Sequence, residues 1–414
     1  MSICAVCTGR CKKLLVKQHA PDLSLDPGAA SPRQRRSQLC ALTLLGGGAR
    51  GAYQAGVLGR LGQALPTLDF DIFTGVSAGA INAAFLANSS GSFAEASGAL
   101  CELWSKLRME HVVRSATTEL LGNVARWGAQ LLSGGIQPLS QAQGLLDTAP
   151  LRSLLRDILP APDGRLLGVE EKLATGRLSA LAVTTTSYET GQAVTFAQQP
   201  PAHEPVSWRR PQRVGRSASI RVEHVLASAA LPVLFPAVEI EGTWHGDGSV
   251  RDTAPLSPAL HLGAERILVV STVRGAVPRP EPAPPSTPYP SLARIVGVTL
   301  NSILYGHMES DVAQMQRFTE LARTCPAARA SGLRPVDVCV LRPTLDLGEI
   351  AAELEHELPR ALRYLTRGLG TKERNSADLL SALLFEARYT QRLIECGRRD
   401  VEQRLPELVE FLSA

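Results

Sequence analysis

Residues 70–86 of this 414-residue chain have the sequence FDIFTGVSAGAINAAFL. The apolar segment 70–74 predicts a strand, and the alanine-rich segment 80–86 predicts a helix. Between them Gly75, Ser77 and Gly79 form a G-x-S-x-G pattern. A nucleophilic serine at such a turn needs a strained backbone and very small neighbours. The stretch therefore predicts a parallel α/β fold with Ser77 as candidate nucleophile, the alternative being a purely structural glycine turn.

A second glycine-rich turn, GGGARG at residues 46–51, follows the apolar strand predicted at 42–45 and precedes a helix. Its backbone N–H groups can form an oxyanion hole for acyl transfer. The spacing also fits the G-x-G-x-x-G fingerprint of dinucleotide-binding oxidoreductases. That alternative has a defect, because Asp69 and Asp71 begin the second strand, whereas a ribose-binding acid should end it.

A serine is too weakly acidic to attack an ester unaided, so a base is needed. His261, His307 and His356 are available, but none lies in a turn typical of a catalytic histidine. Asp247 lies between Gly246 and Gly248, directly after a predicted strand. It is the candidate base, with an ordinary turn residue as the alternative.

Four motifs together resemble the patatin-like phospholipases: GGGARG (46–51), GVSAG (75–79), ASAALPVLFP (227–236) and GDGS (246–249). The resemblance covers residues 40–272, with a weaker likeness at 336–400. It implies a three-layer α/β fold with a mainly parallel central sheet and a helical C-terminal extension. It also implies a Ser–Asp dyad at strand-to-helix turns, without histidine and without metal or cofactor.

The resemblance assigns roles residue by residue. It makes Ser77 the nucleophile and Asp247 the base, and implies oxyanion donors in the first glycine turn and supporting residues around all three turns. The implied donors are Gly46, Gly47, Gly48 and Ala49, and the supporting residues are Arg50, Gly51, Gly75, Gly79 and Gly248. Arg50 is expected to orient the loop or to meet a lipid phosphate. Ser249 replaces the usual Gly or Ala, and its hydroxyl is expected to lower the pKa of Asp247.

The resulting prediction is a lipid acyl hydrolase acting on a phospholipid or another acyl-ester lipid. The alternatives are a nonlipolytic esterase or acyltransferase with the same dyad, and an inactive interaction protein with this fold. Residues 99–159, which are predicted to be helical, and a surface loop at 198–219 are candidates to cap the acyl site, with ordinary scaffold as the alternative.

The chain is predicted to divide into a disordered basic arm (1–38), a catalytic domain (39–275), a proline-rich linker (276–290) and a mainly helical region with one strand (291–414). An amphipathic helix is predicted at 292–318, and Ser376 is a plausible N-cap. The arm contains Cys4, Cys7 and Cys11, which are predicted to be reduced thiols rather than metal ligands.

The net charge of +4 is too small to indicate a nucleic-acid partner, and 44% hydrophobic residues are typical of a globular protein. The charge is uneven, because residues 1–40 contain seven basic and two acidic side chains. We therefore expect the arm to be a candidate tether to an anionic membrane, with a solvated tail as the alternative. No secretory signal or spanning segment is evident, and the cysteine usage favours a cytoplasmic location.

Overall fold

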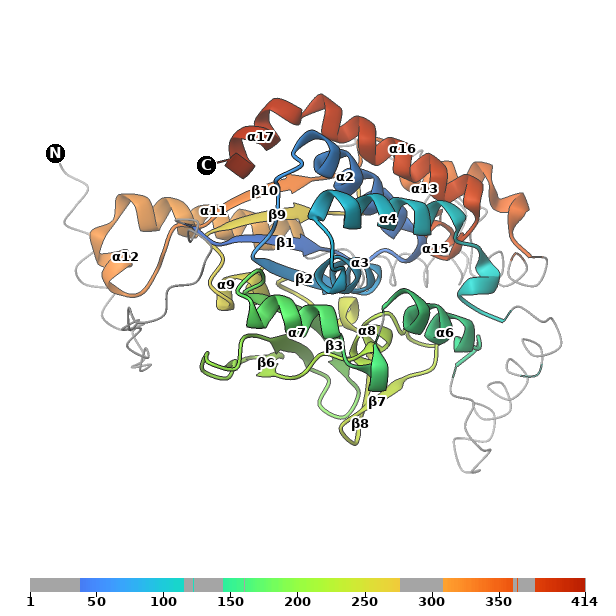
Figure 1. Cartoon of the computed structure of the whole chain (residues 1–414), viewed down its shortest axis with the longest axis horizontal. Coiled ribbons are helices and arrows are strands. Elements are labelled where there is room, and N and C mark those ends of the chain that lie inside the picture. The colour runs from blue at the N-terminus through green and yellow to red at the C-terminus, as the bar shows by residue number, and fades with distance from the viewer. Residues whose placement is uncertain are drawn as a thin grey trace, which may run out of the picture.

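A central ten-stranded sheet organises the computed structural model, which describes residues 38–114, 144–159, 161–275, 308–359 and 377–413, with Gly122 and Arg363 (Figure 1). The main path through the sheet is β10-β9-β1-β2-β3-β4-β6-β5. Its strands are β1 (Cys40–Leu44), β2 (Ile72–Val76), β3 (Ala180–Ser187), β4 (Ala193–Gln198), β5 (Ser207–Arg210), β6 (Arg213–Ser217), β7 (Val238–Ile240), β8 (Thr243–Asp247), β9 (Arg266–Val270) and β10 (Asp337–Leu341). Strands β10, β9, β1, β2 and β3 pair in parallel, so the predicted mainly parallel α/β sheet is confirmed.

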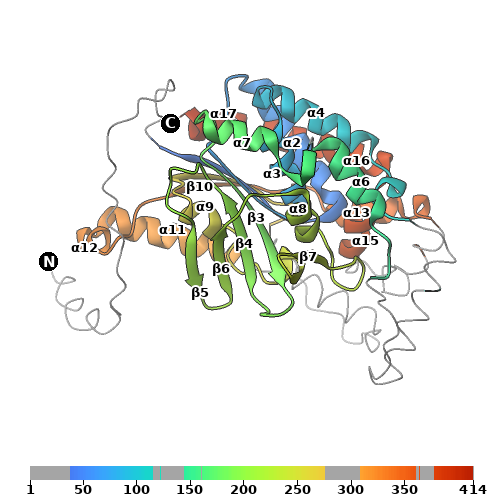
Figure 2. The same cartoon turned by 60° about the horizontal axis from the view of Figure 1, so that its bottom comes forward.

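The helices lie on both faces of this sheet, as the two views of Figures 1 and 2 show. They are α2 (Gly51–Ala64), α3 (Ala78–Asn88), α4 (Phe93–Lys106), α6 (Ala149–Ile158), α7 (Leu167–Ala174), α8 (Val222–Ser228), α9 (Ser257–His261), α11 (Met308–Thr324), α12 (Pro326–Ala330), α13 (Leu347–Glu353), α15 (Ala377–Leu383), α16 (Ala387–Gln403) and α17 (Leu405–Ser413). Among the described residues, no helix is both long and apolar enough to span a bilayer.

Two hydrophobic cores lie on opposite faces of the sheet. In β1, Leu42 and Leu44 belong to the larger core with helices α2, α3, α4 and α16, whereas Ala41 belongs to the smaller one. The smaller core contains Met308 and Val312 of α11. Successive residues of a strand point to opposite faces, so the near-continuous apolar sequence of these strands reflects burial on both sides. The predicted three-layer arrangement is confirmed.

The described part of the C-terminal region packs into the same body as residues 39–275. Strand β10 pairs in parallel with β9, and α16 packs against α2. At Gly56 of α2 an added Cβ would lie 2.1 Å from the carbonyl oxygen of Ile394, so the two helices approach backbone to backbone. Several predicted features lie outside the described residues: the arm up to residue 37, the linker, Ser376, and residues 292–307 of the predicted amphipathic helix. The same holds for residues 115–143 of the segment predicted to be helical, apart from Gly122.

The prediction of a surface loop at 198–219 holds for residues 199–206 but is wrong for 207–217, which form the hairpin β5–β6, and β6 pairs in parallel with β4. The hairpin lies at the edge of the sheet, and most of its side chains are exposed. An edge strand of this kind lacks the apolar alternation that identifies a strand from sequence. Trp208 of β5 instead stacks on His261, with ring centroids 4.4 Å apart.

Candidate active site

Ser77 stands at the turn between β2 and the N-terminus of α3. Its backbone has φ 56° and ψ −129°, a conformation that L-residues rarely adopt. An added Cβ on Gly75 would lie 2.4 Å from the carbonyl oxygen of Gly79, and one on Gly79 would lie 2.1 Å from that of Leu44. The two glycines are therefore required by close backbone contacts, and the turn they permit presents the Ser77 hydroxyl at the end of the sheet.

Asp247, the last residue of β8, lies directly opposite that hydroxyl. The Ser77 Oγ donates a hydrogen bond of 2.7 Å to the Asp247 Oδ2. The other carboxylate oxygen accepts the Ser249 backbone N–H at 2.8 Å. Gly248 passes close to β3, since its Cβ would lie 2.2 Å from the carbonyl oxygen of Thr184. The fold thus joins two residues that are 170 positions apart in the sequence.

The Asp247 carboxyl is completely buried, and this burial raises its pKa from 3.8 to about 6. Hydrogen bonds from Ser77 and from the backbone and side chain of Ser249 lower its pKa, but by less than burial raises it. The predicted direction of the Ser249 contribution agrees with the structure. The net effect is nevertheless a more basic carboxylate, because desolvation penalises its charged form.

The glycine turn of residues 46–51 lies beside Ser77. An added Cβ on Gly46 would lie 3.0 Å from the Ser77 Cβ, and Gly48, with φ +57°, lines the same hollow as Ser77. Among the described residues, no acceptor occupies the N–H groups of Gly47, Gly48, Ala49 or Ala78. Unpaired amides at the N-terminus of α3 and in the glycine turn are suited to stabilise a negatively charged oxygen.

Arg50 supports this turn from behind rather than facing the hollow. Its side chain is 1% exposed, and its Nε donates to the Ser381 Oγ of α15 at 2.6 Å. An added Cβ on Gly48 would lie 2.1 Å from the carbonyl oxygen of Ala382, in the same helix. Of the two expected roles of Arg50, this placement favours orientation of the loop over contact with a lipid phosphate.

Several positioning residues were missed by the sequence reasoning. The Ser228 Oγ accepts the Ser77 N–H at 2.9 Å and donates to the carbonyl oxygen of Thr184 at 2.6 Å, which fixes the strained turn. The Thr272 hydroxyl donates to the Gly46 carbonyl oxygen, and the Thr186 hydroxyl donates to that of Asp247 at 2.8 Å. Ser228 lies within the ASAALPVLFP motif, which was the available signal. Nothing in the sequence marked Thr186, Thr272 or Ser381.

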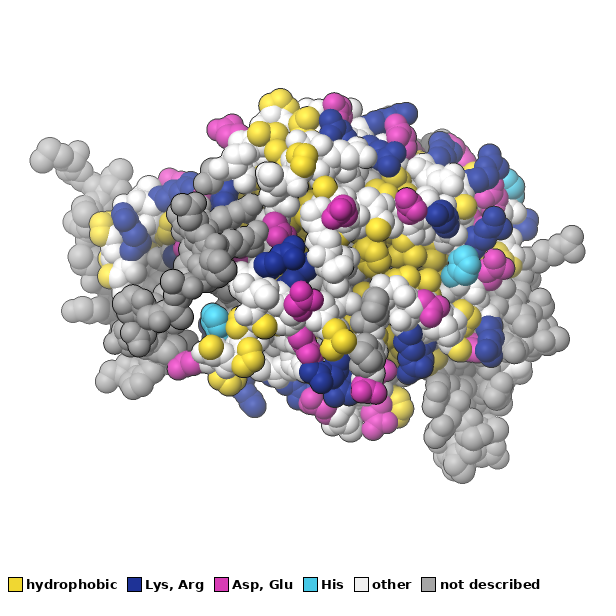
Figure 3. All heavy atoms as spheres, viewed as in Figure 1, with side chains coloured by type: hydrophobic (Ala, Val, Ile, Leu, Met, Phe, Trp, Pro, Cys, Tyr) yellow, Lys and Arg dark blue, Asp and Glu magenta, His cyan; other side chains and the backbone are white. Residues whose placement is uncertain are grey.

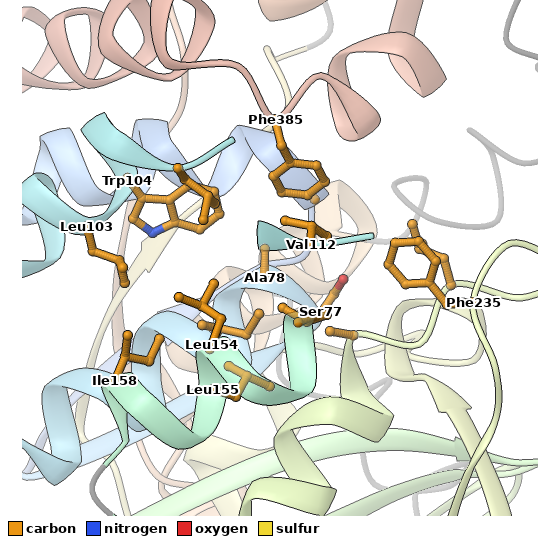
Figure 4. A pocket seen from close by; sticks show the side chains of 16 residues that line it. Ser77, Ala78, Leu103, Trp104, Val112, Leu154, Leu155, Ile158, Phe235 and Phe385 are labelled. Carbon is orange, nitrogen blue, oxygen red and sulfur yellow. The ribbon is translucent and has the colours of Figure 1, made fainter. Parts of the chain in front are cut away.

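An apolar hollow of about 570 Å³, counting its open mouth, leads to Ser77. Figure 4 shows its side chains around Ser77, and Figure 3 shows hydrophobic side chains gathered in a hollow on this face of the molecule. The wall combines residues of α4 and α6 with the 229–235 segment and the C-terminal region. It includes Leu103, Trp104, Leu107, Leu151, Leu154, Leu155, Ile158, Ala229, Leu231, Phe235 and Phe385. Of the two segments proposed to cap the acyl site, the described parts of 99–159 therefore contribute to the lining of the hollow, whereas 198–219 contributes no residue to it.

The histidines lie elsewhere. His261 stacks on Trp208, His356 is beside Glu357 on the surface, and His307 lies outside the described residues. Asp71 accepts the Cys40 N–H at the beginning of β1, so it is at the opposite end of the strands from the glycine turn. Asp71 is therefore too far from the glycine turn to bind the ribose of a dinucleotide held there, as its place at the beginning of the second strand predicted.

The fold and the site define an α/β serine hydrolase with an aspartate as the partner of the serine. A family model described as patatin-like phospholipase matches residues 42–260, more than half of the chain. The chain belongs to the patatin-like phospholipase family, whose members are lipid acyl hydrolases that cleave ester bonds. No curated protein matches it significantly.

Several solved structures are similar to this chain at low sequence identity. The crystal structure of VipD from Legionella pneumophila is 13% identical, with coverage of 87% of this chain and 67% of that chain and a TM-score of 0.31. Human GIVD cytosolic phospholipase A2 is 13% identical, with coverage of 91% and 60% and a TM-score of 0.44. ExoU of Pseudomonas aeruginosa, in complex with SpcU, is 16% identical, with coverage of 91% and 80% and a TM-score of 0.29. The chain thus spans about three fifths of the human phospholipase chain.

Proposed function

We propose that Ser77 and Asp247 hydrolyse the acyl ester of a lipid through a covalent acyl-enzyme. The observation that carries this proposal is the 2.7 Å hydrogen bond from the Ser77 hydroxyl to a fully buried carboxylate, made at a strained turn that opens on the apolar hollow. A hydroxyl needs an adjacent base to become a nucleophile, and a carboxylate of raised pKa is a stronger base than an exposed one.

The proposed reaction has two halves. In the first, Asp247 accepts the Ser77 proton while the Ser77 Oγ attacks the ester carbonyl, and amides of the 46–49 turn with that of Ala78 stabilise the oxyanion. The tetrahedral intermediate then expels the alcohol, which takes the proton from Asp247. In the second half, Asp247 removes a proton from water, the hydroxide attacks the acyl-enzyme, and the fatty acid leaves as Ser77 regains its proton.

The apolar wall supports a hydrocarbon chain as the acyl group of the substrate. No charged side chain is among the residues that line the hollow. We therefore propose that the hollow accommodates the acyl chain, and that the head group of a phospholipid or another lipid lies toward its mouth.

The test measures release of fatty acid from phosphatidylcholine vesicles and from p-nitrophenyl esters. Ser77→Ala and Asp247→Asn are each expected to abolish release, whereas Thr175→Ala, on the surface after α7, is the control and keeps it. Hydrolysis of the soluble ester alone would indicate a nonlipolytic esterase. Transfer of the acyl group to an added alcohol without free acid would indicate an acyltransferase. Full activity of either dyad variant would refute the proposal.

We further propose that the basic arm, residues 1–38, holds the protein at an anionic membrane. Its clustered Lys and Arg residues support this, at about 1 kcal/mol for each basic residue near such a surface. Deletion of the arm is expected to weaken sedimentation with phosphatidylserine vesicles, to leave binding to phosphatidylcholine vesicles unchanged, and to spare turnover of soluble esters. Equal binding to phosphatidylserine vesicles with and without the arm would identify it as a solvated tail.

A further inference from the structure

A buried chain of polar side chains runs from the wall of the hollow to the glycine turn. The Trp104 Nε1 of α4 donates to the Asn82 Oδ1 of α3 at 2.8 Å. The Asn82 Nδ2 donates to the Gln54 Oε1 of α2 at 2.9 Å. Side-chain hydrogen bonds therefore connect three helices that also pack together in the larger core. Trp104, at one end of this chain of hydrogen bonds, lines the same hollow as Ser77 and Gly48.

The chain ends on both sides of the glycine turn. The Gln54 Nε2 donates to the carbonyl oxygen of Leu45 at 2.7 Å, directly before Gly46, and to that of Val270 in β9 at 3.1 Å. The Asn82 Nδ2 also donates to the carbonyl oxygen of Gly51 at 3.2 Å, directly after Arg50. Both termini of the 46–50 segment are thus held by two amide side chains.

The three side chains of this chain of hydrogen bonds are buried. Gln54 and Asn82 are 0% exposed, and Trp104 is 3% exposed. A buried polar group without a partner costs far more than a satisfied one contributes, so these side chains strongly favour the one arrangement that pairs all of them. An added Cβ on Gly51 would lie 2.6 Å from the Trp104 ring, so the ring also packs directly on the end of the turn.

We propose that Gln54 and Asn82 are positioning residues for the oxyanion donors, and that Trp104 ties them to the wall of the acyl hollow. The inference rests on the proposed function, because it concerns the same reaction. Trp104 lines the hollow beside Leu103, and Phe385 stacks near it, with ring centroids 6.5 Å apart (Figure 4). A side chain in this wall therefore helps to set the geometry of amides that act only in the transition state.

The consequence for kinetics is specific. Loss of an interaction made only in the transition state lowers kcat, whereas loss of ground-state binding raises KM. A misplacement of about 1 Å in a catalytic group can cost about 100-fold in rate. Trp104→Phe, which retains a ring in the wall but lacks the N–H donor, and Gln54→Met are each expected to lower kcat for p-nitrophenyl butyrate about 10-fold to 100-fold, with KM within about twofold of wild type.

A double variant tests whether the three residues act as a unit. Trp104 and Gln54 are joined through Asn82, so Trp104→Phe/Gln54→Met is expected to lose no more kcat than the more severe single variant. Trp208→Phe, outside the hollow, is the matched control and is expected to leave both constants unchanged. If Gln54→Met does not fold by circular dichroism, Asn82→Asp replaces it, since it keeps the acceptor for Trp104 but loses both donors.

Two results would overturn the inference. The first is a kcat unchanged in the single variants, or a raised KM with normal kcat, which would make Trp104 only a wall residue. The second is full multiplication of the two losses in the double variant, which would mean independent effects. Ser77→Ala separates this inference from the proposed function, because an active Ser77→Ala variant refutes both, whereas an inactive one with normal Trp104→Phe and Gln54→Met variants refutes the positioning role alone.

Discussion

The pH dependence of ester hydrolysis follows from the burial of Asp247. The carboxyl must be ionised to accept the Ser77 proton, and its pKa is raised from 3.8 to about 6 by desolvation. Activity should therefore rise with pH, reach half of its plateau near pH 6, and fall about 10-fold for each unit below that. An exposed aspartate with a pKa of about 3.9 would leave the rate flat over the same range.

Other groups near Asp247 also have shifted pKa values, and burial raises the pKa of Asp252, five residues further along the chain, to about 7. Burial lowers the pKa of His224 to about 4, and it also lowers the pKa of His245, which stands two residues before Asp247. Ser249→Ala offers an internal check, because the hydrogen bond of this hydroxyl lowers the Asp247 pKa. Its loss should move the inflection to higher pH while the plateau remains.

The assay measures kcat/KM for p-nitrophenyl butyrate at fixed ionic strength from about pH 4.5 to 9. Enzyme exposed to each pH is then returned to neutral pH, where recovery of full activity confirms that it stayed folded. The expected profile has one rising limb with its midpoint near pH 6. A rate that is flat down to about pH 4.5, or an inflection that moves to lower pH in Ser249→Ala, would refute the assignment of Asp247 as the buried base.

The geometry of the site lowers the stability of the folded protein at Asp247 and requires glycine at position 48. The folded-state pKa of Asp247 is above its unfolded value, so the unfolding free energy of the wild type falls as pH rises from about 4 to 6. In urea denaturation, Asp247→Asn should therefore be more stable than wild type by up to about 3 kcal/mol at about pH 8 and by little near pH 4. A lower stability of this variant at about pH 8 would contradict the prediction. Gly48→Ala should lower the unfolding free energy by about 2 kcal/mol or more and kcat by at least about 100-fold, because φ is +57° and the added Cβ meets the Ala382 carbonyl oxygen. Gly98→Ala is the control and should change neither quantity, because no atom lies within 4 Å of its added Cβ. Equal behaviour of the two variants would show that residue 48 does not require glycine.

Much of the fold was accessible from the sequence because its strands are buried on both faces and its turns need glycine. The segments at 42–45 and 70–74 were predicted as strands from their apolar composition, and β1 and β2 confirm them with small shifts of the ends. The hairpin β5–β6 was missed, because its polar side chains face water at the sheet edge. Edge pairing is stabilised by backbone hydrogen bonds to a neighbour, and single-sequence patterns do not contain that neighbour.

The site was accessible only in part for a similar reason. Ser77 and Asp247 lie in turns whose glycines are visible in the sequence, and the structure places the two side chains in contact. Ser381 and Phe385 contribute to the loop and the hollow from more than 300 positions away. They are an ordinary serine and phenylalanine in a helical region, and only the packing of the C-terminal helices against α2 and the glycine turn gives them these positions.

Covalent labelling identifies the nucleophilic serine of this enzyme directly. An alkyl fluorophosphonate should modify wild-type protein once per chain, on Ser77, as identified by peptide mass spectrometry. Ser77→Ala should remain unmodified, and Asp247→Asn should react far more slowly because its side chain cannot accept the proton. Labelling at another serine, or an unchanged labelling rate in Asp247→Asn, would contradict a dyad of Ser77 and Asp247.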